Sequence, residues 1–276
     1  MDPYSRINEV SQLKNVDADL LILGNSRAVC GYNDSLMSQL TGMRCLNLGW
    51  QGHTFDLEYH LIYQTYLRQN SKPRYIIVDV SPVGFFAQEG PLYRIEMLPF
   101  INRPEFQYYV NICPELSWAD RYIFVRYFGK LGKVLKEIDK LNHPGVTKKE
   151  ENPWKRNYNR PEKLKLENDK NIILLFDHFL DECKEQNINV ILVCSPFHIR
   201  EGSSYHDMNG FWSIVKWCNN GTGFPMVTYQ DFFYSDTLYF IDPVHLNERG
   251  RTIFTEKLMH DLDSVEIIKQ QNTNDR

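Results

Sequence analysis

The stretch LLILGNSRAVCGY, residues 20–32, decides how the rest of the sequence is interpreted. Its four leading apolar residues predict a strand that is covered on both faces. Gly24, Asn25 and Ser26 follow where that strand ends. A serine at a strand-to-helix turn usually caps the helix, but it can also be an exposed nucleophile. The residues that the fold places beside Ser26 decide between the two interpretations.

Four other short apolar runs resemble this one, and helical patterns separate them. The five predicted strands are 19–26, 44–50, 74–81, 189–196 and 224–229. Apolar residues recur at helical spacing in 55–70, 163–186, 207–218 and from Asn247 onward, with Asn247 as the expected N-cap of the last helix. Strands that alternate with helices predict crossover connections and a parallel sheet between helical layers. We therefore expect an α/β three-layer sandwich with a five-stranded sheet.

The chain is expected to form a single domain over 1–276, with one segment that breaks the alternation. Residues 82–160 are rich in aromatic side chains, contain no clear strand, and include prolines at 91, 99, 104 and 114. We interpret them as a helical insertion that follows the third strand and lies over the carboxyl edge of the sheet. A plain helical extension of the core is an equally open alternative.

Composition excludes several classes of function. The formal net charge of -4 argues against a nucleic-acid surface, which would carry a basic excess. The six cysteines show no CxxC pairing, so neither a zinc ribbon nor a redox motif is expected. The only spaced acidic and histidine cluster is the pair of Asp242 and His245, so the sequence predicts no metal site. No Gly-x-Gly-x-x-Gly follows the first strand, so a dinucleotide-binding fold is not expected. We expect the chain to use no cofactor. No run approaches the roughly 20 apolar residues of a membrane span.

Three polar signals fall where ligands bind in open parallel sheets, outside the carboxyl ends of the strands. They are Ser26, the run NLGWQGHT at 47–54 and the run DPVHLN at 242–247. Each alone has an ordinary explanation as a cap, a turn or a loop closure. Together they supply a hydroxyl at Ser26, an imidazole at His245 and a carboxylate at Asp242, which are the groups of nucleophilic acyl transfer. The backbone N–H groups of Ser26 and Gly52 are the expected oxyanion donors.

At this point the sequence resembles the SGNH hydrolases, also called GDSL-type esterases. Their first block, Gly-Asp-Ser, is similar to Gly24-Asn25-Ser26, and their last block, Asp-x-x-His, is similar to 242–245. Their second-block glycine matches Gly52, five residues after Asn47. The resemblance covers roughly 19–262 without the insertion, and it implies a flavodoxin-like SGNH fold and a Ser-His-Asp triad. Asn47 and His53 become candidate substrate contacts, although a pocket-wall or surface position remains open for His53.

Two departures from the family pattern matter. The third block of the family supplies an asparagine side chain to the oxyanion hole, and here the corresponding position is Val83. The second departure is Arg27 directly after the serine, which resembles a divergent branch of envelope polysaccharide O-acetyltransferases and D-alanyl transfer proteins. Members of that branch often carry a membrane segment before the first strand. If an anchor was trimmed from this chain, the resemblance implies a cell-envelope or extracytoplasmic location and a membrane-bound acyltransferase partner; otherwise it implies a cytoplasmic one.

Arg27 itself has two interpretations. Its guanidinium suits bidentate binding of a substrate carboxylate or phosphate. It suits equally well a structural role at the sheet edge, where it would hold Asp79 or another carboxylate, and this second role is slightly favoured.

The sequence thus predicts a serine esterase or O-acyltransferase that acts on an acyl ester, in the first place acetyl, of a carbohydrate or cell-envelope polymer. An α/β-hydrolase is a weaker rival, because that family places Gly-x-Ser-x-Gly at a mid-chain elbow. A stronger alternative of another class is a binding or accessory protein on the same fold, with weak or lost activity. The valine in place of the third-block asparagine and the aromatic segment both fit that alternative.

Overall fold

The computed structural model of the chain describes residues 12–52, 54–85, 101–102, 122, 170–202 and 208–264. Five strands form one sheet: β1 (Leu20–Leu23), β2 (Cys45–Asn47), β3 (Tyr75–Asp79), β4 (Asn189–Cys194) and β5 (Met226–Thr228). Their spatial order is β2-β1-β3-β4-β5, and every neighbouring pair is parallel. This is the order of flavodoxin-like doubly wound folds. The predicted parallel α/β sheet is therefore confirmed.

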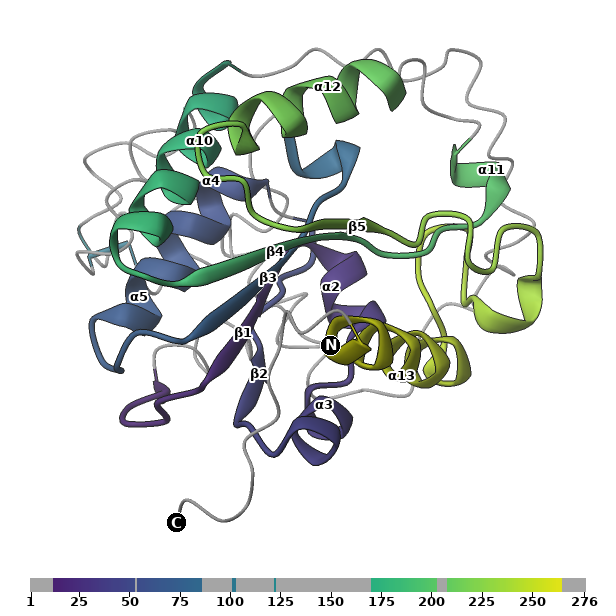
Figure 1. Ribbon diagram of the computed structural model, residues 1–276, viewed down its shortest axis with the longest axis horizontal. Helices are drawn as coiled ribbons and strands as arrows, with labels where there is room; N and C mark the ends of the chain where they lie inside the picture. The colour runs from purple at the N-terminus through teal and green to yellow at the C-terminus, as the bar shows by residue number, and fades with distance from the viewer. Residues whose placement is uncertain are drawn as a thin grey trace.

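Helices cover both faces of this sheet and make three layers (Figure 1). One face packs against a helix formed by α4 (Phe55–Leu57), η1 (Glu58–Tyr63) and α5 (Gln64–Leu67), and against α10 (Lys170–Glu185) and α12 (Met208–Asn219). The other face packs against α2 (Ser26–Gly31), α3 (Asp34–Thr41) and α13 (Glu248–Ser264).

The two faces enclose separate apolar cores, because successive strand residues point in opposite directions. In β1, Leu21 and Leu23 join the first core, whereas Leu20 and Ile22 join the second. All four are fully buried, and burial of each contributes about 1.5–3 kcal/mol. A four-residue strand that is apolar at every position is thus explained by cover on both sides.

Among the described residues, the predicted helices form where the apolar spacing placed them; positions 163–169 of the predicted helix over 163–186 lie outside those residues. The helix over 55–67 buries the periodic residues of the pattern, but its middle section, η1, has π-helical geometry that the pattern does not predict. Asn247 does cap α13, since its Oδ1 accepts from the Gly250 N–H at 3.0 Å. The predicted insertion over 82–160 lies outside the described residues, apart from η2 (Pro82–Phe85) and isolated positions at 101–102 and 122.

The topology puts a switch point at the carboxyl edge of the sheet. The strand order reverses between β1 and β3, and ligands of such folds bind at that switch point. Ser26 follows β1 directly, and Asp79 is the last residue of β3. Two further short elements, α11 (Ile199–Gly202) and η6 (Thr237–Tyr239), follow β4 and β5. Across the part of the chain that the structure describes, no helix has the length and apolar character of a membrane span.

Candidate active site

The turn between β1 and α2 presents Ser26, and we call residues 24–27 the nucleophile turn. Asn25 is the N-cap of α2, and its Oδ1 accepts from the Arg27 N–H at 3.0 Å. The capping duty therefore belongs to Asn25 and not to Ser26. The serine is the first helical residue and is partly exposed, whereas Gly24, Asn25 and Arg27 are buried. Its hydroxyl is thus available for another partner.

That partner is His245, which comes from the other end of the chain. The Ser26 Oγ lies 2.7 Å from His245 Nε2, although the two residues are 219 positions apart in sequence. On the opposite side of the imidazole, Nδ1 lies 2.8 Å from Asp242 Oδ2. The structure thus brings all three predicted triad side chains into one chain of hydrogen bonds. Their part in catalysis stays a prediction.

Residues 242–247, which we call the histidine loop, are organised by Asp242. Its Oδ1 accepts from the backbone N–H groups of Val244 at 2.8 Å and His245 at 2.9 Å. Burial raises the pKa of this carboxyl, but the hydrogen bonds and charge of His245 and the two N–H donors outweigh burial and hold the pKa below its usual value. The carboxylate therefore stays ionised beside the imidazole, as a group that fixes the histidine tautomer must.

Two contacts hold the histidine loop against the rest of the sheet edge. Phe240 and Leu246 form an antiparallel bridge across its base. The backbone N–H of His198 donates to the Pro243 carbonyl at 2.9 Å. His198 is itself buried, and its Nδ1 accepts from the Arg200 N–H at 3.2 Å. It belongs to the support of the loop and not to its surface.

Arg27 is buried, and its guanidinium contacts Ser195 and Phe197. Its Nη2 donates to Ser195 Oγ at 3.0 Å and to the Ser195 carbonyl, and its guanidinium lies 4.8 Å from the centre of the Phe197 ring. Ser195 in turn donates to Asp79 through its N–H and its hydroxyl, both at 3.0 Å. Of the two interpretations of Arg27, these contacts favour the structural one, and its assignment as a substrate contact stays a prediction.

Asp79 is the buried acid of this cluster. Burial raises its pKa above the usual carboxyl value, and the positive charge of Arg27 and the Ser195 hydrogen bonds offset part of that effect. Tyr32 also donates its hydroxyl to Asp79 Oδ1, at 3.3 Å. The cluster joins the ends of β3 and β4 to α2, the helix that begins with Ser26.

Asn47 is also buried, and its side-chain amide contacts backbone groups of the protein. Its Nδ2 donates to the carbonyls of Ala28 at 2.9 Å and Tyr32 at 3.1 Å, and its Oδ1 accepts from the Gly49 N–H at 2.9 Å. These bonds fasten the loop after β2 to α2. Its buried amide thus has protein partners on both sides, and the prediction that Asn47 contacts substrate stays a prediction.

The two expected oxyanion donors lie on adjoining loops. Gly52 occupies a turn with φ of +71°, a left-handed conformation that suits glycine. The neighbouring Trp50 donates its N–H to the Gly24 carbonyl at 2.9 Å, which ties this loop to the nucleophile turn. Within the described ranges, no acceptor is recorded for the N–H of Ser26 or Gly52. His53, the other candidate on this loop, lies outside the described residues.

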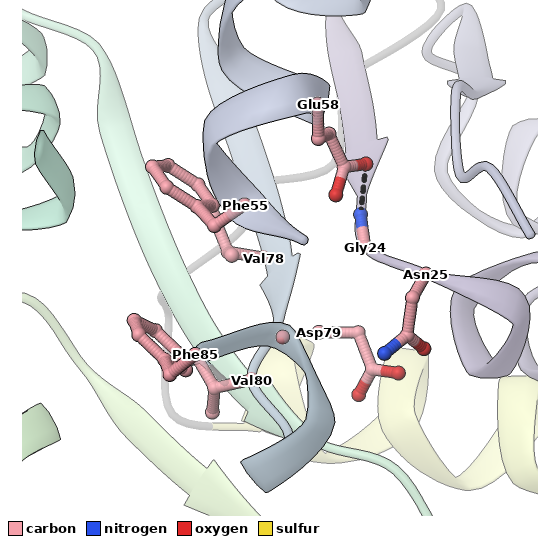
Figure 2. A pocket seen from close by; sticks show the side chains of 9 residues that line it. Gly24, Asn25, Phe55, Glu58, Val78, Asp79, Val80 and Phe85 are labelled. Carbon is pink, nitrogen blue, oxygen red and sulfur yellow. Dashed lines mark hydrogen bonds between the residues drawn. The ribbon is translucent and has the colours of Figure 1, made fainter. Parts of the chain in front are cut away.

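A small pocket lies against the inner side of the nucleophile turn (Figure 2). Its lining includes Gly24 and Asn25 but neither Ser26 nor His245. The remaining lining residues are Phe55, Glu58, Val78, Asp79, Val80, Gly84 and Phe85. Val83, the position that corresponds to the third-block asparagine, lies in the adjoining η2.

Sequence reasoning missed three residues that hold the nucleophile turn. Glu58 accepts from the Gly24 N–H, Ser81 Oγ accepts from Asn25 Nδ2 at 3.0 Å, and Ser195 binds Arg27. One signal was available: Glu58 is an acidic residue within the apolar repeat of the helix over 55–67, where a buried charge needs a partner. Ser81 and Ser195 closely follow apolar strands, as polar groups at the carboxyl edge do.

The described part of the chain contains no group of three His, Cys, Asp or Glu side chains arranged to hold a metal ion.

No family model matches the sequence, and no match was found among curated proteins. Solved structures do resemble this chain in overall fold. A GDSL-like lipase from Bacteroides thetaiotaomicron has a TM-score of 0.48 at 10% sequence identity, with 95% of this chain and 98% of the lipase covered. A family two carbohydrate esterase from Clostridium thermocellum, in complex with cellohexaose, has a TM-score of 0.44 at 8% identity, with 92% of this chain and 66% of the esterase covered.

Proposed function

We propose that this chain is a serine esterase or O-acyltransferase with Ser26 as its nucleophile. The observation that carries the proposal is the hydrogen-bonded series from Ser26 Oγ through the imidazole of His245 to Asp242, at 2.7 and 2.8 Å. Ser26 and His245 are 219 positions apart in sequence, so only the folded chain brings the members of this series together. A serine hydroxyl next to a carboxylate-oriented imidazole is the arrangement that activates a hydroxyl for acyl transfer.

The proposed reaction has two halves. The Ser26 oxygen attacks the ester carbonyl while its proton passes to His245 Nε2, and the N–H groups of Ser26 and Gly52 receive the developing oxyanion. The C–O bond to the leaving alcohol then breaks, and His245 returns the proton to that alcohol. Water or a sugar hydroxyl attacks the acyl-serine in the second half, again with His245 as base and then acid. Asp242 keeps its charge throughout and stabilises the imidazolium.

A serine-directed fluorophosphonate probe and p-nitrophenyl acetate test the proposal on three proteins. The wild type is expected to be labelled and to hydrolyse the ester, and Ser26→Ala to do neither. Ser35→Ala is the matched control, because Ser35 is an exposed serine on α3 and should leave both readouts unchanged. Labelling of Ser26→Ala at the wild-type rate contradicts the assignment of the nucleophile. A wild type that is neither labelled nor active supports the binding or accessory alternative instead.

As substrate we propose an acyl ester of a carbohydrate or cell-envelope polymer, on the strength of the sequence resemblance. Acetylated oligosaccharides test this when acetate release is compared with that from p-nitrophenyl acetate. Added free oligosaccharide separates the two reaction types, because a transferase moves the acyl group to the new hydroxyl and a hydrolase releases it as acid. If no acetylated carbohydrate is turned over, the proposed substrate class is wrong even if the esterase activity stands.

A further inference from the structure

Glu58 is a buried acid that the proposed mechanism does not use. It is the first residue of η1, six positions after Gly52, and only 3% of it is exposed. A buried carboxylate is costly unless donors satisfy it. Its Oε1 accepts a hydrogen bond from the backbone N–H of Gly24, and Figure 2 shows this bond directed at the end of β1. The acid therefore contacts the residue two positions before the proposed nucleophile.

Gly24 is held on both sides by one neighbouring segment. Its N–H donates to Glu58, and its carbonyl accepts from the Trp50 N–H at 2.9 Å. Both partners belong to residues 50–58, which also contain Gly52. The N–H and the carbonyl of Gly24 thus bind Glu58 and Trp50, which are the two ends of this segment. These two hydrogen bonds fix the position of the Gly52 loop relative to the nucleophile turn.

The backbone at Gly24 is also closely packed, so the turn has little room to move. Its φ of +146° is a conformation that residues with side chains rarely adopt. A Cβ placed there would lie 2.8 Å from the Ala28 Cβ and 2.9 Å from the Asp79 Cβ. The Glu58 carboxylate thus binds Gly24 at a place where Ala28 and Asp79 already pack closely against the backbone.

The helix geometry at Glu58 is an independent observation. At this residue the helix changes from α to π, and π segments are rare and frequent at functional sites. A π turn adds a residue to the ring that each hydrogen bond closes, so it alters the face on which the following residues lie. The local change of pitch coincides with the residue that reaches Gly24.

We propose that Glu58 is a positioning residue, which sets the Gly52 N–H at the correct place relative to the Ser26 N–H by binding Gly24. This inference rests on the proposed function, because the two N–H groups are the expected oxyanion donors. Such donors act only when they are held at hydrogen-bonding distance from the developing charge, and a displacement of about 1 Å costs on the order of 100-fold in rate. Glu58 touches no reacting atom in this scheme.

Three substitutions at Glu58 and one control test the proposal on the full chain. Glu58→Gln keeps an acceptor oxygen at the same reach, Glu58→Asp keeps the charge but shortens the reach, and Glu58→Met keeps the length without an acceptor. Tyr59→Phe is the control: Tyr59 is next to Glu58 in η1, and the change removes its 2.8 Å hydrogen bond to Glu182 on α10 but leaves Gly24 untouched. The readouts are kcat and KM for p-nitrophenyl acetate, the rate of fluorophosphonate labelling, and the unfolding temperature.

We expect kcat to follow the reach of the acceptor. Glu58→Gln should stay within about 10-fold of the wild type, while Glu58→Asp and Glu58→Met should lose about 30- to 300-fold in kcat with KM nearly unchanged. Labelling by the fluorophosphonate should slow in parallel, because the phosphonyl oxygen uses the same donors. Tyr59→Phe should lower the unfolding temperature without changing kcat.

The result that overturns the inference is a Glu58→Met protein with the kcat of the wild type, or a Glu58→Asp protein at least as active as Glu58→Gln. If Glu58→Met does not fold, the order of the glutamine and aspartate variants decides alone. A failure of the proposed function has a different signature, namely a wild type that is inactive and unlabelled, and it removes the reaction that Glu58 is inferred to serve.

Discussion

The nucleophile turn and the histidine loop place the two ends of the candidate triad by different means. The turn is buried around Ser26, and its partners Glu58, Ser81 and Ser195 lie 34, 56 and 168 positions from the residues that they bind. The histidine loop is partly open: the side chains of His245 and Asp242 are 25% and 20% exposed. Its main hydrogen bonds join residues two or three positions apart.

The comparison separates what global packing contributes from what local structure contributes. A turn held by distant partners shares its stability with the whole fold, so changes there should alter both unfolding and activity. A loop held by its own aspartate can lose function while the fold stays intact. Three substitutions and one pH dependence test this division, in order of decreasing expected effect.

The largest effect is expected in the histidine loop, from Asp242→Asn. The asparagine Oδ1 still accepts from Val244 and His245, so the loop should keep its shape, but the amide no longer selects the required imidazole tautomer. We expect kcat for p-nitrophenyl acetate to fall by about 10,000-fold, with a shift in the urea unfolding midpoint at neutral pH that is smaller than that of Arg27→Met. Asp236→Asn is the control, since Asp236 caps η6 a few residues earlier by accepting from the Leu238 N–H. A kcat of Asp242→Asn within tenfold of the wild type contradicts the role given to Asp242.

The next effect is expected in the nucleophile turn, from Arg27→Met. This change removes the buried cation that donates to Ser195 and whose charge offsets the burial of Asp79. Removal of the charge that compensates a buried acid costs about 3–5 kcal/mol of the free energy of unfolding. Urea denaturation measures the loss. Arg251→Met serves as the comparison, because the pair of Arg251 and Glu248 is exposed and should contribute at most about 1 kcal/mol. Equal losses for the two variants mean that the buried cluster does not anchor the turn.

The features that could be predicted from the sequence are those that depend on local structure, and the features that could not are those that depend on global packing. The strands, the parallel sheet and the helix over 55–67 depend on apolar periodicity, which is a local property of the chain. The Asp242–His245 pair is equally local, because the two residues are three positions apart and the backbone N–H groups of Val244 and His245 bind the carboxylate. Ser26 was found by its place after a strand and by its order relative to these blocks.

The supports of the nucleophile turn could not be predicted, because their distances depend on how loops meet at the sheet edge. Arg27 and Asn47 look like ligand-binding residues in sequence, yet packing directs both toward backbone carbonyls. The π-helical register that starts at Glu58 has no signature in the apolar pattern. The residue types indicated that polar side chains gather at the sheet edge. Only three-dimensional packing shows which of these side chains form hydrogen bonds within the protein.

A smaller effect is expected from Asn25→Ala. The variant loses the cap of α2 and the hydrogen bond to Ser81, which together should cost about 1–2 kcal/mol of unfolding free energy. Asn33→Ala is a close control, since Asn33 caps α3 by accepting from the Leu36 N–H at 3.1 Å. Both variants should lose stability, but only Asn25→Ala should lower kcat, because only this cap orients Ser26. An equal kcat for the two would show that the turn is held without Asn25.

The smallest effect is the pH dependence of the stability that Asp242 contributes. Its pKa in the folded protein lies below the usual value, since hydrogen bonds from His245 and two backbone N–H groups outweigh the effect of burial. The folded state therefore binds this proton less readily than the unfolded state. The stability that the Asp242 carboxylate contributes is fully present above the pKa of the unfolded state, about 4. It is lost as the pH falls through the lower pKa of the folded state. Unfolding free energies of the wild type and Asp242→Asn, compared from about pH 5 downward, should converge with acidification. A difference that grows as the pH falls would mean that the carboxyl group is protonated in the native loop, and an uncharged Asp242 could not hold the imidazolium that acyl transfer requires.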